Sequence, residues 1–342
     1  MTRGPAPERG LLEATDAWFL THGLAYFVPE ERAAAHAALR GRRTLPLAVL
    51  SGLVAAAAGA GLAWVTGQPS VAPALMISAA MVAVLVYALT SLRAAPIVRW
   101  ALGRTFGSLR TLLPMMSRAL PLLLLFVTFL FINGEVWQVA ADLPTGTLWL
   151  TALLFVLLAT GFLLVRLPEE VDKVDDEVDA DFLRRTTAGT PVADVARELL
   201  SDVEGRPALA AYAEVRGFER WNLVLVLVVI QAVQVLLMSV GVFVFFLAFG
   251  GLVMDLDVQS AWTAIPESDI RALPVLSQVS EPLVQVSVFL ASFSALYLTV
   301  STVTDETYRV QFFGSVMREL ERAVGVRAVY LAVRDRDADV VV

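Results

Sequence analysis

The residues with the most chemical potential are polar side chains inside long apolar segments. Glu135 is an acid within such a segment, in the run FINGEVWQ, where Asn133 and Gln138 accompany it. Ionisable groups in a membrane are costly, so they usually pair with another group or line a water-filled path. Counted from Arg118 at 1.5 Å per residue, Glu135 lies roughly 25 Å along a helix, close to the far boundary. It is therefore either a cation or proton site on a pathway or a hydrogen-bonding group at the boundary.

Two other apolar segments carry polar groups at helical spacing. Gln231 and Gln234 are three residues apart and share one helix face near the middle of their segment. Ser287, Ser294 and Ser301 recur every seven residues, which keeps them on one stripe of a helix. Such groups either hydrogen-bond a neighbouring helix and allow close packing, or line a pathway. For the glutamines, hydrogen bonding to a neighbouring helix is the favoured interpretation and pathway lining the alternative, whereas for the serines packing and pathway lining fit equally well. Both sets are pathway or ion-binding candidates together with the Glu135 group.

Residues that are absent exclude several chemistries. There is no cysteine, which excludes thiolate catalysis, disulfides and Fe–S clusters. The two histidines, His22 and His36, both precede the first apolar segment, so we expect no haem or zinc site inside the membrane. No phosphate-binding or dinucleotide-binding glycine motif occurs. We therefore predict no enzymatic activity, no cofactor and no metal, and the net charge of −7 argues against nucleic acid as a partner.

The elements that position these residues are long apolar helices. Apolar residues make up 57% of the chain and charged residues only 17%, a balance typical of membrane proteins. A bilayer core of about 30 Å needs about 20 apolar residues in a helix. Six segments meet this requirement: 45–65, 73–92, 120–139, 147–165, 222–250 and 284–304. The predicted fold class is therefore all-α, a polytopic membrane protein with six transmembrane helices and additional amphipathic helices at the cytoplasmic side and the membrane interface.

The distribution of positive charge predicts the orientation. With six spans, the tails 1–44 and 305–342 share one side with the loops 93–119 and 166–221, and these segments hold 25 of the 26 Lys and Arg residues. The opposite side holds only Arg271, in the loop 251–283. The positive-inside rule puts both termini in the cytoplasm of a multi-pass protein of the cell membrane. No cleavable signal peptide is expected, and the preference for arginine over lysine, with Lys173 the one lysine, indicates a GC-rich bacterial genome.

Two segments near the first spans read as helices at the membrane surface. Within the tail 1–44, residues 11–39 predict two short helices, with Pro29 at the start of the second. They indicate an amphipathic approach in the plane of the membrane, with a protein-binding helical hairpin as the alternative. The segment 93–119 predicts an amphipathic helix that begins at Pro96. Its basic residues make it a candidate for anionic lipid headgroups in the bilayer: Arg93, Arg99, Arg104, Arg110 and Arg118.

The remaining cytoplasmic segments are the loop 166–221 and the tail. The acidic run 169–181 predicts a solvated helical extension of the fourth span, with divalent-cation binding as the alternative. Helices are expected over 191–203 and 207–217. The tail 305–342 predicts a helix that continues the last span, although 326–333 fits a strand or a helix equally well. The apolar stripes of these helices suggest packing against each other or in a homo-oligomer.

Two classes of function remain. The first is a channel or secondary transporter for a cation or proton, with its path along the third, fifth and sixth spans. The alternative is a membrane scaffold or sensor that transports nothing and presents cytoplasmic helices to a partner. The abundance of predicted helix outside the bilayer supports the alternative, whereas the polar groups inside the spans favour transport slightly.

Overall fold

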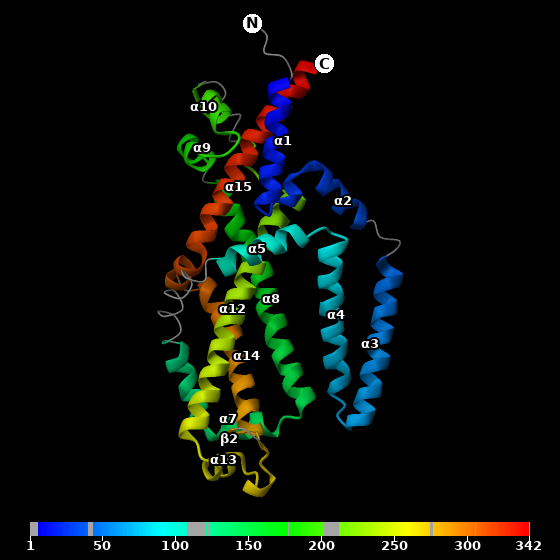
Figure 1. The fold of residues 1–342 in the computed structure, drawn as a ribbon, viewed down its shortest axis with the longest axis vertical. Helices are drawn as coiled ribbons and strands as arrows, with labels where there is room; N and C mark the ends of the chain where they lie inside the picture. The colour runs from blue at the N-terminus through cyan, green and yellow to red at the C-terminus, as the bar shows by residue number, and fades with distance from the viewer. Residues whose placement is uncertain are drawn as a thin grey trace.

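The fold is almost entirely helical in the computed structural model, which describes residues 6–39, 44–107, 121, 123–176, 178–201, 212–273, 276–304 and 306–341. The part of the chain so described is all-α apart from one short antiparallel hairpin, β1 (Ala272–Leu273) and β2 (Leu276–Ser280). The predicted all-α class is confirmed. Figure 1 shows the helices arranged lengthwise, with both chain ends at one end of the molecule.

Four helices are long and apolar enough to cross a membrane. They are α4 (Val71–Thr90), α8 (Thr145–Asp176), α12 (Gly217–Val253) and α14 (Glu281–Thr304). A fifth span results if the helix Leu123–Phe131 and α7 (Gly134–Asp142), which bend by 77° at their junction, count as one. A further helix, α3 (Thr44–Thr66), covers the first predicted segment, and its stretch Gly52–Thr66 is apolar but shorter than these.

The third predicted segment is wrong as one continuous helix. The chain leaves the helix after Phe131, and Asn133 takes an extended conformation as the N-cap of α7. Its side-chain oxygen accepts hydrogen bonds from the backbone N–H groups of Glu135 and Val136, which have no partner within the new helix. The acid in the first turn interacts favourably with the positive end of the helix dipole. This capping chemistry explains the bend that hydropathy alone misses.

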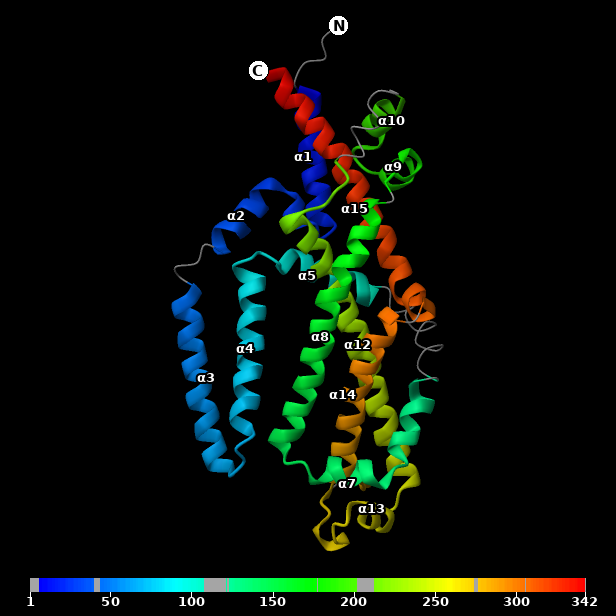
Figure 2. The same ribbon diagram turned by 180° about the vertical axis from the view of Figure 1, so that it is seen from behind.

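The bundle consists of α8, α12, α14 and the helix Leu123–Phe131, with α12 at its centre. Half of the most apolar 18 residues of α12 are buried, compared with 6% of those in α4. The α3–α4 hairpin stands beside the bundle; near its start α4 is tied to α8, and at its end the chain leads into α5 (Figure 2). Gly59 lets the two hairpin helices approach closely, because a Cβ there would lie 3.0 Å from the carbonyl oxygen of Ala72.

A group of helices that we call the head covers one end of the bundle. It comprises α1 (Ala6–Thr21), the 3₁₀ turn η1 (Ala25–Phe27), α2 (Pro29–Leu39), α9 (Ala180–Thr187), α10 (Ala193–Ser201) and the C-terminal half of α15 (Glu306–Val341). The predicted pair of helices before the first span, with the second starting at Pro29, is confirmed. Helix α5 (Ala95–Gly107) runs crosswise between the head and the bundle (Figure 1).

The opposite end carries a smaller cap made of α7, α13 (Leu256–Thr263), the 3₁₀ turn η2 (Glu267–Asp269) and the β-hairpin. Its core is aromatic: Phe131 stacks on Phe246 with ring centroids 4.7 Å apart, and Trp137 contacts both Phe131 and Trp262. The indole N–H of Trp137 donates to the carbonyl of Phe131 at 2.7 Å, which satisfies a carbonyl at the end of the broken helix. The cap therefore packs tightly over this end of the bundle.

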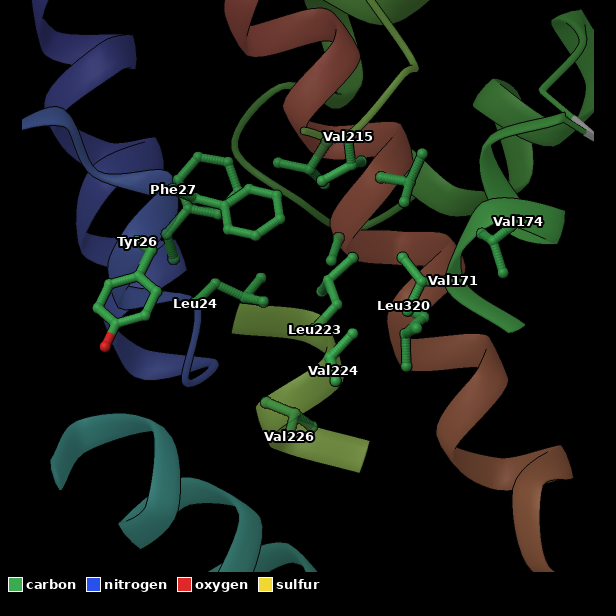
Figure 3. Packing of buried hydrophobic residues seen from close by; sticks show 14 of the residues in the cluster. Leu24, Tyr26, Phe27, Val171, Val174, Val215, Leu223, Val224, Val226 and Leu320 are labelled. Carbon is green, nitrogen blue, oxygen red and sulfur yellow. The ribbon is translucent and has the colours of Figure 1, made fainter. Parts of the chain in front are cut away.

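The head shares a continuous hydrophobic core with the adjoining half of the bundle. Figure 3 shows Leu24 and Phe27 from the N-terminal segment facing Leu223 of α12 and Leu320 of α15. All four side chains are buried, and burial of each large apolar side chain contributes about 1.5–3 kcal/mol. The head is therefore packed against the bundle and is not a loose appendage.

The structure decides three expectations about the helices outside the long apolar segments. Residues 326–333, which fitted a strand or a helix, lie within α15. The expected helix over 191–203 is present as α10, although it begins at Ala193. The expected helix over 207–217 is wrong for residues 212–216, which are not helical and lead directly into α12, while 207–211 lie outside the described residues.

Candidate functional site

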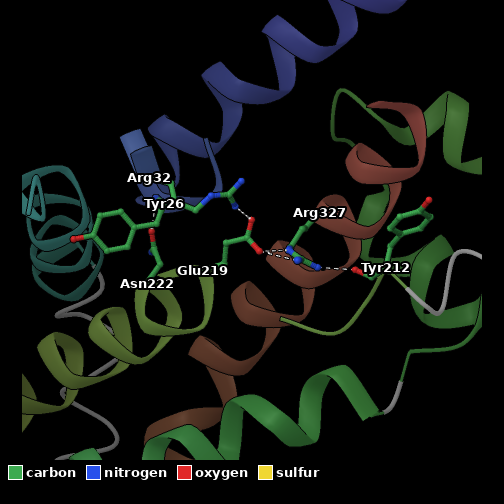
Figure 4. A network of polar contacts seen from close by, with 6 residues as sticks. All are labelled: Tyr26, Arg32, Tyr212, Glu219, Asn222 and Arg327. Carbon is green, nitrogen blue, oxygen red and sulfur yellow. Dashed lines mark hydrogen bonds and ion pairs between the residues drawn. The ribbon is translucent and has the colours of Figure 1, made fainter. Parts of the chain in front are cut away.

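Glu219 is the centre of a buried ionic network where the head meets the bundle. It lies in the first turn of α12, and its side chain is only 7% exposed. One carboxylate oxygen pairs with Arg32 of α2, and the other accepts from Arg327 of α15 at 2.7 Å (Figure 4). Arg327 also donates to the backbone carbonyl of Tyr212 at 2.6 Å. One carboxylate thus joins the N-terminal helices, the fifth predicted span and the C-terminal helix.

Asn222 provides a second connection on the same face of α12, three residues later. Its side-chain oxygen accepts from the backbone N–H of Tyr26, and its side-chain nitrogen donates to the carbonyl of Gly23, both at 2.9 Å. Tyr26 in turn donates its hydroxyl to the carbonyl of Leu92 at 2.6 Å, which ties the end of α4 to the same segment. Gly23 must be glycine here, because its φ is +72° and a Cβ would lie 2.8 Å from Trp100.

The predicted lipid-headgroup arginines have mixed environments. Arg93 pairs with Glu31 of α2 and Arg104 pairs with Glu319 of α15, each at 3.0 Å. Both pairs are partly exposed, so each contributes little to stability. Arg99 is exposed on α5, while Arg110 and Arg118 lie outside the described residues. Two of these basic groups therefore have acidic partners within the chain.

Much of the predicted acidic run is engaged with cations of the chain itself. Helix α8 continues to Asp176, so the first part of the run is the helical extension that the sequence predicts. Asp172 forms a two-bonded pair with Arg220 of α12, at 2.8 and 2.6 Å. Asp179 caps α9. Other acids pair with a basic residue within one helical turn: Glu169 with Arg166, Glu170 with Lys173 and Asp181 with Arg184. The side chains of 175–177 lie outside the described residues.

Asp16 of α1 lies beside Tyr330 of α15 in the head, and its Oδ1 is buried without a hydrogen-bond partner among the described residues. Burial raises the pKa of the Asp16 carboxyl, and its interaction with the Tyr330 hydroxyl opposes that rise only in part. Burial, with a smaller contribution from Asp16, raises the pKa of Tyr330 to about 12. Burial also raises the pKa of Tyr26 to about 12. The pKa values of these groups depend on their burial in the head, so they report on whether the head remains packed.

The predicted pathway group around Glu135 lies in the cap. Asn133 caps α7, and the side chains of Asn133, Glu135 and Gln138 are all exposed. Phe131, two residues before the cap residue, stacks on Phe246 of α12. Phe246 is twelve residues, or roughly 18 Å along the helix, from Gln234. The structure therefore does not bring the Glu135 group together with the two glutamines.

The glutamines and serines lie in helix interfaces. Gln231 and Gln234 are buried on α12, and Ser287 and Ser294 are buried on α14, whereas Ser301 is half-buried. The hydroxyl of Ser294 donates to the carbonyl of Leu290 on its own helix, at 2.7 Å. Nearby, Ser239 of α12 donates to the carbonyl of Ala291 of α14, at 2.8 Å. These contacts are those of tightly packed helices.

Two atoms in these interfaces are buried without a hydrogen-bond partner among the described residues: the side-chain oxygens of Gln234 and Ser287. They belong to different levels of the bundle, because α12 and α14 run antiparallel and Ser239 contacts Ala291. An unsatisfied buried oxygen costs about 1–3 kcal/mol. Such atoms are the features of the spans that packing alone does not explain.

Sequence reasoning missed the network of Glu219. Glu219 immediately precedes the expected fifth span, and its two arginine partners are 187 and 108 residues away in the chain. Nothing in the local pattern pairs them. The available signal was the spacing of Glu219 and Asn222, which places two polar groups on one face at the start of an otherwise apolar helix.

Comparison with protein-family models, with characterised proteins and with solved structures gives no match for this chain.

Proposed function

We propose that this chain is a six-span protein of the cell membrane with both termini in the cytoplasm. The spans are α3, α4, the bent pair of Leu123–Phe131 with α7, α8, α12 and α14. The support is the length and apolar character of four of these helices, or five with the bent pair, together with the placement of 25 of the 26 positive residues in segments that six spans would put on one side. In this orientation the head is cytoplasmic, the cap faces outward and α5 lies in the plane of the inner interface.

Within this frame, the best supported function is that of a membrane scaffold or sensor whose head presents helices to a cytoplasmic partner. The observation that carries it is the network of Glu219, which joins α12 to both Arg32 and Arg327. Buried charges are strongly coupled to their partners, because breaking such a pair leaves an uncompensated charge. A displacement of α12 in the membrane is therefore transmitted to α2 and α15 of the head. Conversely, a partner that binds the head changes the position of α12.

The packing of the spans also favours this function over transport. The polar groups proposed for a pathway are distributed between the exposed cap and closed helix interfaces, and aromatic side chains fill the cap end of the bundle. A pathway needs polar groups that follow one another along an accessible route. Ser239 and Ser294 instead donate hydrogen bonds to backbone carbonyls within the helix interfaces.

The proposal is tested with the full chain in two assays. First, proteoliposomes containing the wild type should show no more cation or proton flux than vesicles without protein. Second, the cytoplasmic partner recovered from native membranes with the wild type should be lost or weakened with Glu219→Leu and retained with Asp194→Leu. The control removes an acid that pairs with Arg197 at the exposed surface of α10. Flux through the wild type, or equal recovery with both variants, would contradict the proposal.

A cation or proton pathway is the second candidate, supported by the unpaired buried oxygen of Gln234 in the middle of α12. If this candidate is correct, proteoliposomes should conduct, and Gln234→Leu should lower the flux at least tenfold. Glu135→Gln tests the cap as an outer mouth in the same assay. Absence of flux in the wild type removes this candidate.

A further inference from the structure

A groove separates the α3–α4 hairpin from α8 near the cap end of the molecule. It encloses about 410 Å³, which falls within the range of small-molecule sites, roughly 300–1,000 Å³. Three helices contribute its walls, and none of the lining side chains is charged; the lining includes Leu62, Thr66, Gln68, Leu75, Thr145 and Trp149.

Hydrogen bonds between the helices fix the walls of the groove relative to one another. The side-chain oxygen of Gln68 accepts from the backbone N–H of Gly146 at 3.2 Å, which ties the hairpin turn to the start of α8. Trp149 donates its indole N–H to the hydroxyl of Ser78 at 2.9 Å, which spans from α8 to α4. Gly146 itself allows no side chain, because a Cβ would lie 2.7 Å from Ser70. The walls are thus fixed relative to one another.

The lining changes from polar to apolar along the helices. Thr66 ends α3, Gln68 lies in the turn and Thr145 begins α8, so the polar groups gather at one rim. Leu62 and Leu75 lie about one turn deeper, where the lining is apolar. Such a gradient matches an amphiphile with a polar end and an apolar chain. An ion or a polar solute does not fit it, because the deep lining offers no charge and few hydrogen-bond donors.

We propose that this groove binds one acyl chain of a phospholipid from the outer leaflet, with the glycerol region of the lipid at the rim of Thr66, Gln68 and Thr145. The inference rests on the proposed membrane placement and orientation. The bound chain would fill the space between the start of α4 and the start of α8, where Val71, Leu75 and Trp149 line the groove. The half-exposed ring of Trp149 lies where aromatic side chains favour the membrane interface.

The test uses the full chain in vesicles of phosphatidylcholine that contain a phosphatidylcholine with a photoreactive diazirine in its acyl chain. After irradiation, the labelled residues are mapped by mass spectrometry. We expect label at Leu62, Leu75 and Trp149 at least fivefold above that at Val84, a more exposed apolar residue elsewhere on α4. Excess unlabelled single-chain phosphatidylcholine should compete for the groove and leave the label at Val84 unchanged.

Two variants fill the groove from different helices, Leu62 on α3 and Leu75 on α4, so a folding defect in one does not remove the test. Leu75→Trp and Leu62→Trp should each lower the label at Trp149 at least fivefold, whereas Val84→Trp should leave it unchanged. Label in simple proportion to exposure, or insensitivity to both groove variants, would overturn the proposal. Absence of label from the exposed faces of α4 and α12 would instead contradict the membrane placement itself.

Discussion

Removal of the Glu219 carboxylate gives the sharpest energetic prediction. In Glu219→Leu, two arginines lose their shared partner, but their situations differ. The side chain of Arg32 is 27% exposed and can turn towards water, whereas that of Arg327 is 10% exposed and remains buried beside an apolar residue. Breaking a buried ion pair by removing one partner costs about 3–5 kcal/mol. We expect Glu219→Leu to destabilise the packing of the head on the bundle by this amount, with most of the loss due to Arg327.

Hydrogen exchange of the full chain in nanodiscs measures this loss. Amides of α2 and of the C-terminal half of α15 should exchange about 10²- to 10⁴-fold faster in the variant, at 1.36 kcal/mol per tenfold change. The double variant Glu219→Leu with Arg327→Met should recover most of the protection, because no buried charge is then left unpaired. A double-mutant cycle should therefore give a coupling energy at or above the upper end of the usual range, about 3 kcal/mol. Unchanged exchange in Glu219→Leu, or purely additive effects, would refute the reasoning.

Three further predictions concern the head. Asp16→Asn should make the stability of the head less sensitive to pH. Because the pKa of Asp16 in the folded protein is raised above 3.8, the stability that it contributes in the wild type is full below that pH and falls as pH rises through the raised pKa. If chemical unfolding gives the same dependence on pH for the variant and the wild type, this prediction is contradicted. The phenolate absorbance of Tyr330, isolated by difference with Tyr330→Phe, should titrate near pH 12, and a midpoint near 10 would show that it is not buried. Gly325→Ala should lower the melting temperature because its Cβ would meet the hydroxyl of Thr186 at 2.0 Å, whereas Gly103→Ala, with open space around its Cβ, should not; equal effects would contradict the packing of α9 on α15.

The long apolar helices were predictable because hydropathy and length depend on local composition. The expected segments 73–92, 147–165, 222–250 and 284–304 all lie within observed helices or differ from them by two residues at an end. Pro29 also predicted its helix start correctly, because proline needs no backbone donor in a first turn. Such features need no knowledge of distant partners.

The break at Asn133 shows a limit of hydropathy. The segment 120–139 is apolar enough for one span, but an N-cap residue followed by glycine and an acid favours the start of a new helix. Trp137, near the end of that segment, is buried in the cap against Phe131. A local capping signal was thus present in the sequence but was outweighed by the apolar average.

The candidate site depended on contacts that no local pattern encodes. Glu219, Arg32 and Arg327 come together only when the N-terminal helices, α12 and α15 are folded against one another. Conversely, Glu135 and Gln234 appeared related because both are polar groups in apolar surroundings, although they lie in different parts of the fold. The sequence identified unusual residues, whereas their grouping required the tertiary structure.

Rigid coupling between the head and α12 is the central claim, and a distance measurement tests it most directly. The chain has no cysteine, so Leu20→Cys in α1 and Leu236→Cys in α12 can carry one pair of spin labels. Both positions are exposed, and Leu236 lies roughly 21 Å along α12 from the contact of Asn222 with Gly23. Double electron–electron resonance in nanodiscs should give one narrow distance distribution that broadens when Glu219→Leu is added. A broad distribution without that substitution, or an unchanged narrow one with it, would contradict the claim.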